Sequence, residues 1–306
     1  MATAQVQFYK SAIRFGGNYF PCYPGAQLTA PLNYAVPPII GNYWQLNYGV
    51  GLVQPYVEVS LAVLDHATLC PLLQTFLNNW LTRVADAGHD TNLLGGTGVL
   101  DFWDGYRGWS MLGTKADSFT IGTSKGDDIR FTARFCGTQL QLLSADPGFG
   151  GWDTSALLRF PSLKFLNQSN GDFSAYDQKI WRLDLSFSNN HNPDLSLDGT
   201  MFPVACNAGM QTAGFQIMVQ AKDQVNIPGG DPNLQAGTQL GTADGLAFGF
   251  RIAGAAKRAD FKLNRIINAT PAERPITPPR IMRQYAFLCL GSDAQTNPPL
   301  VVSSNF

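Results

Sequence analysis

Residues 180–187 read IWRLDLSF, and the alternation of their side chains decides the fold class. From residue 182 onward, arginine, aspartate and serine alternate with leucine, leucine and phenylalanine. Successive side chains of a strand point to opposite faces of a sheet, so this stretch predicts a strand with one buried face and one polar face. The same period of two occurs at residues 128–135 (DIRFTARF) and 215–220 (FQIMVQ).

Further strands are predicted along much of the chain. They lie at residues 56–64, 117–123, 246–253, 260–267 and 282–290. Clusters of Gly, Asn, Asp and Pro separate these segments, and many short strands with turn-rich links are typical of antiparallel architectures. The fold is therefore predicted to be mainly β, a barrel or a sandwich, and not a set of parallel βαβ units.

One segment has a helical period instead. Between Thr68, which can cap a helix, and Gly88, which can end one, apolar residues recur three and four positions apart. We expect a helix over residues 68–86, packed by this apolar stripe against the sheet of the first half of the chain.

The chain has 306 residues, about twice the length of a typical domain of about 150 residues. Two tandem β domains are therefore predicted, over residues 1–150 and 151–306. A faint internal repeat supports the division: ADSF at 116–119 and ADFK at 259–262 each open a pair of strands. The strand near residues 57–64 is expected to correspond to the strand near 180–187.

Composition narrows the classes of function. Charged residues make up 14% of the chain and the formal net charge is −1, which argues against tight binding of nucleic acid. Low charge with many polar and aromatic residues favours a surface covered by other subunits, although a secreted β-protein shares this composition. No run of apolar residues is long enough for a membrane span, and the first residues lack a secretory signal. The five cysteines are predicted to be reduced, mostly buried thiols of a protein made in a cytoplasm.

No motif for catalysis stands out. The three histidines lack zinc-site spacing, there is no GxSxG elbow, and neither Gly-rich stretch completes a phosphate-binding motif. The carboxylate pairs Asp101/Asp104 and Asp127/Asp128 are interpreted as ordinary surface-loop residues. We therefore expect no catalytic residues, no cofactor and no metal site.

Two long loops are predicted at residues 88–115 and 223–244. Loops of this length are uncommon unless they have a function. Together with an N-terminal arm at residues 1–30, they are our candidates for contacts between subunits. The candidate interface residues are aromatic in the first loop and polar or proline in the second: Phe102, Trp103, Tyr106, Trp109, Asn226, Pro228 and Asn233.

Residues 179–223 resemble the strand–turn–strand core of siphophage tail tube subunits. A strand ends in the polar turn Asn189-Asn190, a second strand follows, and a third strand opens near Gly214. Residues 246–303 resemble the end of that family, with two strands, a Pro-rich link and a long final strand. The first half departs from the pattern, because a helix is predicted where a hairpin is expected, although the family fold includes a helix packed on its barrel.

The resemblance implies a virion protein of the phage tail, made in the bacterial host cytoplasm. Subunits of that family pair their sheets edge to edge into rings, which stack into a hollow tube that carries DNA during ejection. With two tube domains in a chain, the ring is expected to be a homotrimer with pseudo-sixfold symmetry. The implied partners are the tail terminator, tape measure and distal tail proteins, with DNA passing through the lumen without tight binding and no insertion into a membrane.

Two other functions remain open at this point. The first is another structural β-protein of a phage, such as a tail terminator, a distal tail protein or a capsid component. The second is a carbohydrate-binding β-sandwich, in which Trp103 and Trp109 form a platform for sugar rings.

Overall fold

A computed structural model of the chain describes twenty-one strands and the turns that adjoin them. The described residues are 12–15, 18–23, 27–29, 32–35, 49–53, 55–62, 98–103, 107–143, 145, 163–166, 180–194, 203, 205–207, 209–220, 239–240, 248–253, 258–263, 265–269, 282–290 and 300–304. Every regular element within them is a strand, so the interpretable part of the protein is mainly β, as predicted.

The strands of the first half are β1 (Ala12–Phe15), β2 (Asn18–Pro21), β3 (Gln27–Thr29), β4 (Leu32–Ala35), β5 (Gly49–Val53), β6 (Tyr56–Ala62), β7 (Gly98–Trp103), β8 (Gly108–Ser124), β9 (Arg130–Cys136) and β10 (Gln139–Leu142). Those of the second half are β11 (Leu163–Leu166), β12 (Ile180–Ser188), β13 (Asn192–Asp194), β14 (Ala205–Asn207), β15 (Thr212–Gln220), β16 (Gln239–Leu240), β17 (Phe248–Ala253), β18 (Arg258–Leu263), β19 (Arg265–Asn268), β20 (Met282–Leu290) and β21 (Leu300–Ser304). All of their pairings are antiparallel.

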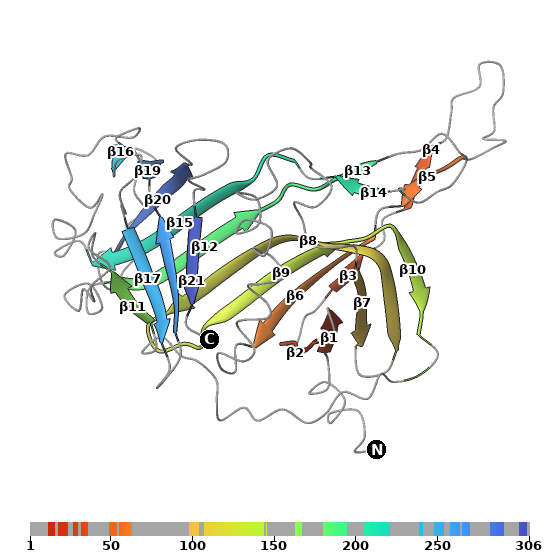
Figure 1. Ribbon diagram of the computed structural model, residues 1–306, viewed down its shortest axis with the longest axis horizontal. Coiled ribbons are helices and arrows are strands. Elements are labelled where there is room, and N and C mark those ends of the chain that lie inside the picture. The colour runs from red at the N-terminus through yellow and green to blue at the C-terminus, as the bar shows by residue number, and fades with distance from the viewer. Residues whose placement is uncertain are drawn as a thin grey trace.

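The strands form two sets with the same order. In the large sheet, the first set is ordered β3-β6-β9-β8 and the second β12-β15-β20-β19. A second layer repeats as well, as β1-β7-β8-β10 in the first set and β11-β17-β18-β21 in the second. A hairpin interrupts each set at the same point, β4–β5 after β3 and β13–β14 after β12. Figure 1 shows the second-layer strands of the two sets at opposite ends of the large sheet.

The two sets are joined because β8 pairs with β12 from Ser118↔Ser188 to Ser124↔Arg182. The large sheet therefore runs without interruption from β3 to β19, across the boundary predicted near residue 150. The same strand β8 belongs to both layers of the first set: it pairs with β7 and β10 over its first residues and with β9 and β12 over its last. Gly113 lies between these two parts with a φ of 58°, a left-handed conformation that glycine adopts at little cost.

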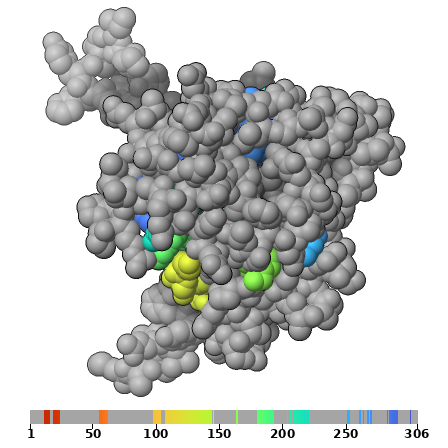
Figure 2. All heavy atoms as spheres, turned by 90° about the vertical axis from the view of Figure 1, so that its left-hand side faces the viewer, coloured from red at the N-terminus to blue at the C-terminus, as the bar shows by residue number. Residues whose placement is uncertain are grey.

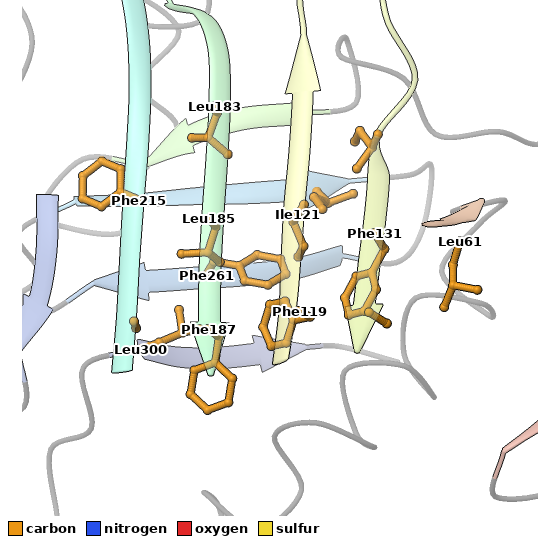
Figure 3. Close-up of a cluster of buried hydrophobic side chains, with 14 of the residues drawn as sticks. Leu61, Phe119, Ile121, Phe131, Leu183, Leu185, Phe187, Phe215, Phe261 and Leu300 are labelled. Atoms are coloured by element: carbon orange, nitrogen blue, oxygen red, sulfur yellow. The ribbon is translucent and has the colours of Figure 1, made fainter. Parts of the chain in front are cut away.

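The core lies between the layers. Buried side chains from both strand sets form one hydrophobic cluster. Figure 3 shows Phe119, Leu185 and Phe187 of the large sheet facing Phe261 and Leu300 of the second layer, whose strands run across those of the large sheet. The Phe119 ring stacks on Phe131 and Phe187, with centroid distances of 5.1 and 5.4 Å. Such aromatic pairs add about 0.5–1.5 kcal/mol each beyond the area that they bury.

Several predictions of elements are confirmed and others are wrong. Strands are present at each predicted site, although residues 260–267 are divided between β18 and β19. The loop predicted at residues 88–115 is wrong where it is described, because 98–103 and 108–115 belong to the paired strands β7 and β8. The sheet order equates β6 with β15, so the predicted correspondence of residues 57–64 with 180–187 is also wrong. Within the N-terminal arm predicted at residues 1–30, residues 12–15, 18–21 and 27–29 are instead the paired strands β1, β2 and β3. The helix predicted over 68–86 lies outside the described residues.

The four described cysteines, Cys22, Cys136, Cys206 and Cys289, are free, and all but Cys22 are buried, as predicted. Burial raises the pKa of Cys289 to about 12. Such a thiol is not ionised near neutral pH and behaves as a small hydrophobic group.

Asp101 is buried, which corrects its interpretation as a surface-loop residue. It lies in β7 opposite Arg14 of β1 and Ser110 of β8, and its side chain is 5% exposed. Arg14 Nε donates a hydrogen bond to Asp101 Oδ2 at 2.8 Å, and Ser110 Oγ donates to Asp101 Oδ1 at 2.7 Å. The carboxylate thus links three neighbouring strands of the second layer.

We expect Asp101→Ala to lower the free energy of unfolding by about 1–3 kcal/mol, because it leaves buried Ser110 and half-buried Arg14 without their acceptor. Urea denaturation measures this change. The matched control is Asp127→Ala in the exposed turn after β8, which should stay within about 0.5 kcal/mol of the wild type. Equal effects of the two substitutions would contradict the role assigned to Asp101.

Candidate assembly face and the junction of the strand sets

The face of the large sheet that points away from the core is polar. Its middle row crosses five neighbouring strands as the register partners Ser60, Thr132, Thr120, Ser186 and Gly214. Ser60 and Thr132 share a hydrogen bond of 3.1 Å between their hydroxyl groups, and Ser186 Oγ donates to the Gly214 carbonyl at 3.1 Å. We call this outward-facing side of β6, β9, β8, β12 and β15 the polar face.

The polar face is hollowed near Gly122. A shallow depression of about 420 Å³ lies among residues of β8, β9 and β12. Gly122 contributes no side chain there, and a Cβ at this position would meet Asp184 Oδ1 at 2.7 Å. Figure 2 shows yellow residues near the turn between β8 and β9 at the surface of the molecule, beside the green start of β12.

Three cationic side chains on this face or beside it lie against a carboxylate or an aromatic ring. Arg182 Nε lies 2.6 Å from Asp184 Oδ2. Arg130 lies over the Tyr23 ring and Lys125 over the Trp181 ring, at 5.2 and 4.8 Å from the ring centroids. Both contacts are within the range of cation–π attraction. Small hydroxyl groups thus line the middle row of the polar face, and these three positive charges are held close to a carboxylate or an aromatic ring.

Arg134 connects the polar face to a buried carboxylate. Its guanidinium lies 4.6 Å from the centroid of the Tyr56 ring, and its Nε lies 3.6 Å from Asp117 Oδ2. The register of β8 with β9 shifts between Ala116 and Ser118, so Asp117 occupies an irregularity in the strand. Bulges of this kind redirect a side chain out of the regular alternation.

The chain that follows β12 fits onto this irregularity. Asn189 donates from its backbone N–H to the Asp117 carbonyl at 2.8 Å and from Nδ2 to the Ala116 carbonyl at 2.9 Å. His191 donates from its backbone N–H to Asp117 Oδ1 at 2.9 Å, and its Nδ1 lies 3.2 Å from the same oxygen. Asn190 between them has a φ of 49°, a conformation that asparagine tolerates better than most residues. This corner fastens the second strand set to the first.

The environment of Asp117 changes its ionisation. Burial by itself raises the pKa, but hydrogen bonds from the His191 side chain and backbone, together with the positive charges of His191 and Arg134, outweigh it and leave the pKa below its ordinary value of 3.8. A carboxylate with a lowered pKa stabilises the folded state at any pH above its unfolded value.

The residues predicted as interface candidates are only partly described. Phe102 is buried, with 4% of its surface exposed, and its ring stacks on half-buried Trp109 at a centroid distance of 6.3 Å. Trp103 is also half-buried, at the end of β7. Tyr106, Asn226, Pro228 and Asn233 lie outside the described residues. The contact of these side chains with other subunits stays a prediction.

Sequence reasoning missed both the polar face and the Asp117 corner. The alternating serine and threonine residues of the predicted strands were a signal for the polar face. The Asp117 corner has no local signal, because its partners are more than seventy residues away in the chain. Within the described residues, no group of three or more His, Cys, Asp or Glu side chains is placed to hold a metal ion.

No family model matches the chain, and no curated protein matches it either. The described part of the structure has no helix long and apolar enough to cross a membrane.

The lowered pKa of Asp117 gives a prediction for acid conditions. Its folded pKa is below the unfolded value, so its contribution to stability should be present above about pH 4 and should be lost as the pH falls through the folded pKa. We therefore expect Asp117→Asn to be less stable than the wild type at pH 7, with the difference shrinking as the pH falls below about 4. Urea unfolding over this range measures it, with Asp127→Asn as the exposed control. A difference that does not depend on pH would contradict the assignment.

Proposed function

We propose that this chain is a structural subunit of a phage tail tube, built from two tandem tube domains and assembled from three copies per ring. The observation that carries the proposal is the repeated order of strands within one continuous sheet. Two equivalent strand sets joined edge to edge make one chain resemble two neighbouring subunits of a ring. Three chains then supply six sets, as the resemblance to siphophage tail tube subunits implies.

The polar face supports a role as the wall of the lumen. DNA must pass this wall without being retained, and unpaired lysine or arginine side chains would bind phosphates and release their counterions. Arg182 instead lies against Asp184, and Arg134 lies between Tyr56 and Asp117. Serine, threonine and glycine give the middle row of this wall a hydrated surface without charge.

The second layer and the inserted hairpins then face outward or toward the neighbouring rings. In this proposal the helix expected over residues 68–86 packs on the first domain, and the segment 223–244 contacts the next ring. The finished tube would bind the tape measure protein inside, and the terminator and distal tail proteins at its ends. The location of the protein is then the tail of the virion.

The other functions have less support. A sugar platform needs tryptophan faces that are open to solvent, and Trp109 is half-buried against Phe102. A terminator or distal tail protein would use the same kind of edge contact but would stop after a single ring. The length of the assembly therefore distinguishes a tube subunit from a terminator or a distal tail protein.

Negative-stain microscopy and sedimentation velocity of the purified protein at rising concentration test the proposal. We expect rings of three chains with six similar lobes, which stack into hollow tubes as the concentration increases. Rings that never stack would favour a terminator or distal tail protein. Single copies at every concentration would contradict the proposed function.

A further inference from the structure

Within the chain, the two strand sets pair with each other through the edges of their sheets. The last strand of the first set, β8, pairs with the first strand of the second set, β12, at seven successive positions. The contact is head to tail, because the two edges that meet belong to different strands of the repeat. A head-to-tail contact leaves one edge of each kind unused at the two ends, and its repetition gives a closed ring or an open filament.

The unused edges are those of β3 and β19. β3 is the first strand of the first set, and β19 is the last strand of the second. Because every pairing from β3 to β19 is antiparallel, β3 runs in the same direction as β12, and β19 runs in the same direction as β8. A β19 strand beside the β3 strand of another copy would therefore also be antiparallel.

The hydrogen bonds identify which peptide groups point outward from each edge. Ala269 donates its N–H to the Ala286 carbonyl, so Ala269 faces β20 and its neighbour Asn268 faces away from β20. On the other edge, the Tyr23 N–H donates to the Ser60 carbonyl, so the peptide groups of Ser60 point to the side of β6 where β3 lies. Peptide groups two residues apart point the same way, so those of Glu58 point to β3 as well. Gln27, the partner of Glu58, thus faces β6, and Leu28 faces outward.

The β19 edge is partly covered in the single chain. The two-residue strand β16 pairs with it at Gln239↔Ile267 and Leu240↔Ile266. Very short edge strands are one way in which proteins limit uncontrolled pairing between copies. In the described residues, no strand pairs with the outer edge of β3.

We propose that β3 of one copy pairs antiparallel with β19 of the next copy, in place of β16, and repeats the β8–β12 contact between chains. The partner is thus a second copy of this chain, bound through backbone hydrogen bonds at one edge of each kind. The inference deepens the proposed function, on which it rests, by naming the strands that close the ring. It makes the ring interface directional, so each copy pairs with one neighbour through β3 and with the other neighbour through β19.

Asn268→Pro tests this contact. Proline removes the outward N–H of β19 and adds a ring at that edge, while the bonds of Ile267 and Ala269 to β20 remain. The matched control is Leu142→Pro in β10. Leu143 donates to the Gly108 carbonyl, so Leu142 also faces outward, from an edge that the proposal does not use, and its side chain is 70% exposed.

Sedimentation velocity and thermal melting of the wild type and both variants measure assembly and folding. We expect Asn268→Pro to melt as a folded protein but to lose at least 90% of the assembled fraction, and Leu142→Pro to assemble as the wild type does. Because the variant keeps its β3 edge, adding one part of Asn268→Pro to four parts of wild type should also shorten or open the assemblies. The mixing experiment requires a folded variant. If Asn268→Pro melts at a clearly lower temperature than the wild type, Asn268→Lys replaces it, because lysine places a charge on the same edge strand.

The outcomes separate the two proposals. Assembly of the edge variant at the wild-type level, or an equal loss in Leu142→Pro, would overturn the β3–β19 contact and leave the tube function standing. Wild-type protein that stays single at every concentration would overturn both.

Discussion

The pairing of β8 with β12 is the interaction on which the rest of the structure depends. It joins strands that are more than fifty residues apart in the chain, and it is the connection that makes one sheet out of two strand sets. Phe119 stacks on Phe187 across this pair, and the Asp117 corner fixes its end. Because β8 also forms part of the second layer, the same strand sets the position of both layers of the first set.

The polar face is a consequence of this pairing. Once β12 is held in register beside β8, its leucine and phenylalanine side chains must all enter the core, and its arginine, aspartate and serine side chains must all face away. A slip of one residue would expose Leu183 and Leu185 and bury Arg182 and Asp184, at a cost of several kcal/mol. The alternation in the sequence therefore specifies the register, and the register specifies which groups line the proposed lumen.

Local patterns predicted the strands well and their arrangement poorly. The alternation at residues 128–135 and 180–187 was sufficient for the fold class and for most element positions. It failed at β7 and the start of β8, because glycines and aromatic residues there were interpreted as a loop, and because the buried carboxylate of Asp101 interrupts the apolar pattern. The order of the strands depends on partners far apart in the chain, which no local period reveals. The repeat was therefore visible as two similar segments but not as two identical sheet orders.

Native-state hydrogen exchange at the β8–β12 junction tests the central claim most directly. The Trp181 carbonyl accepts a hydrogen bond from the Lys125 N–H, so the amides of Leu183 and Leu185 face β8. If one continuous sheet unites the two strand sets, these amides should exchange only through global unfolding, with the same free energy as the most protected amides of β9 and β15. Exchange at the junction with a clearly lower free energy, while β9 and β15 stay protected, would show two independent units and contradict this account.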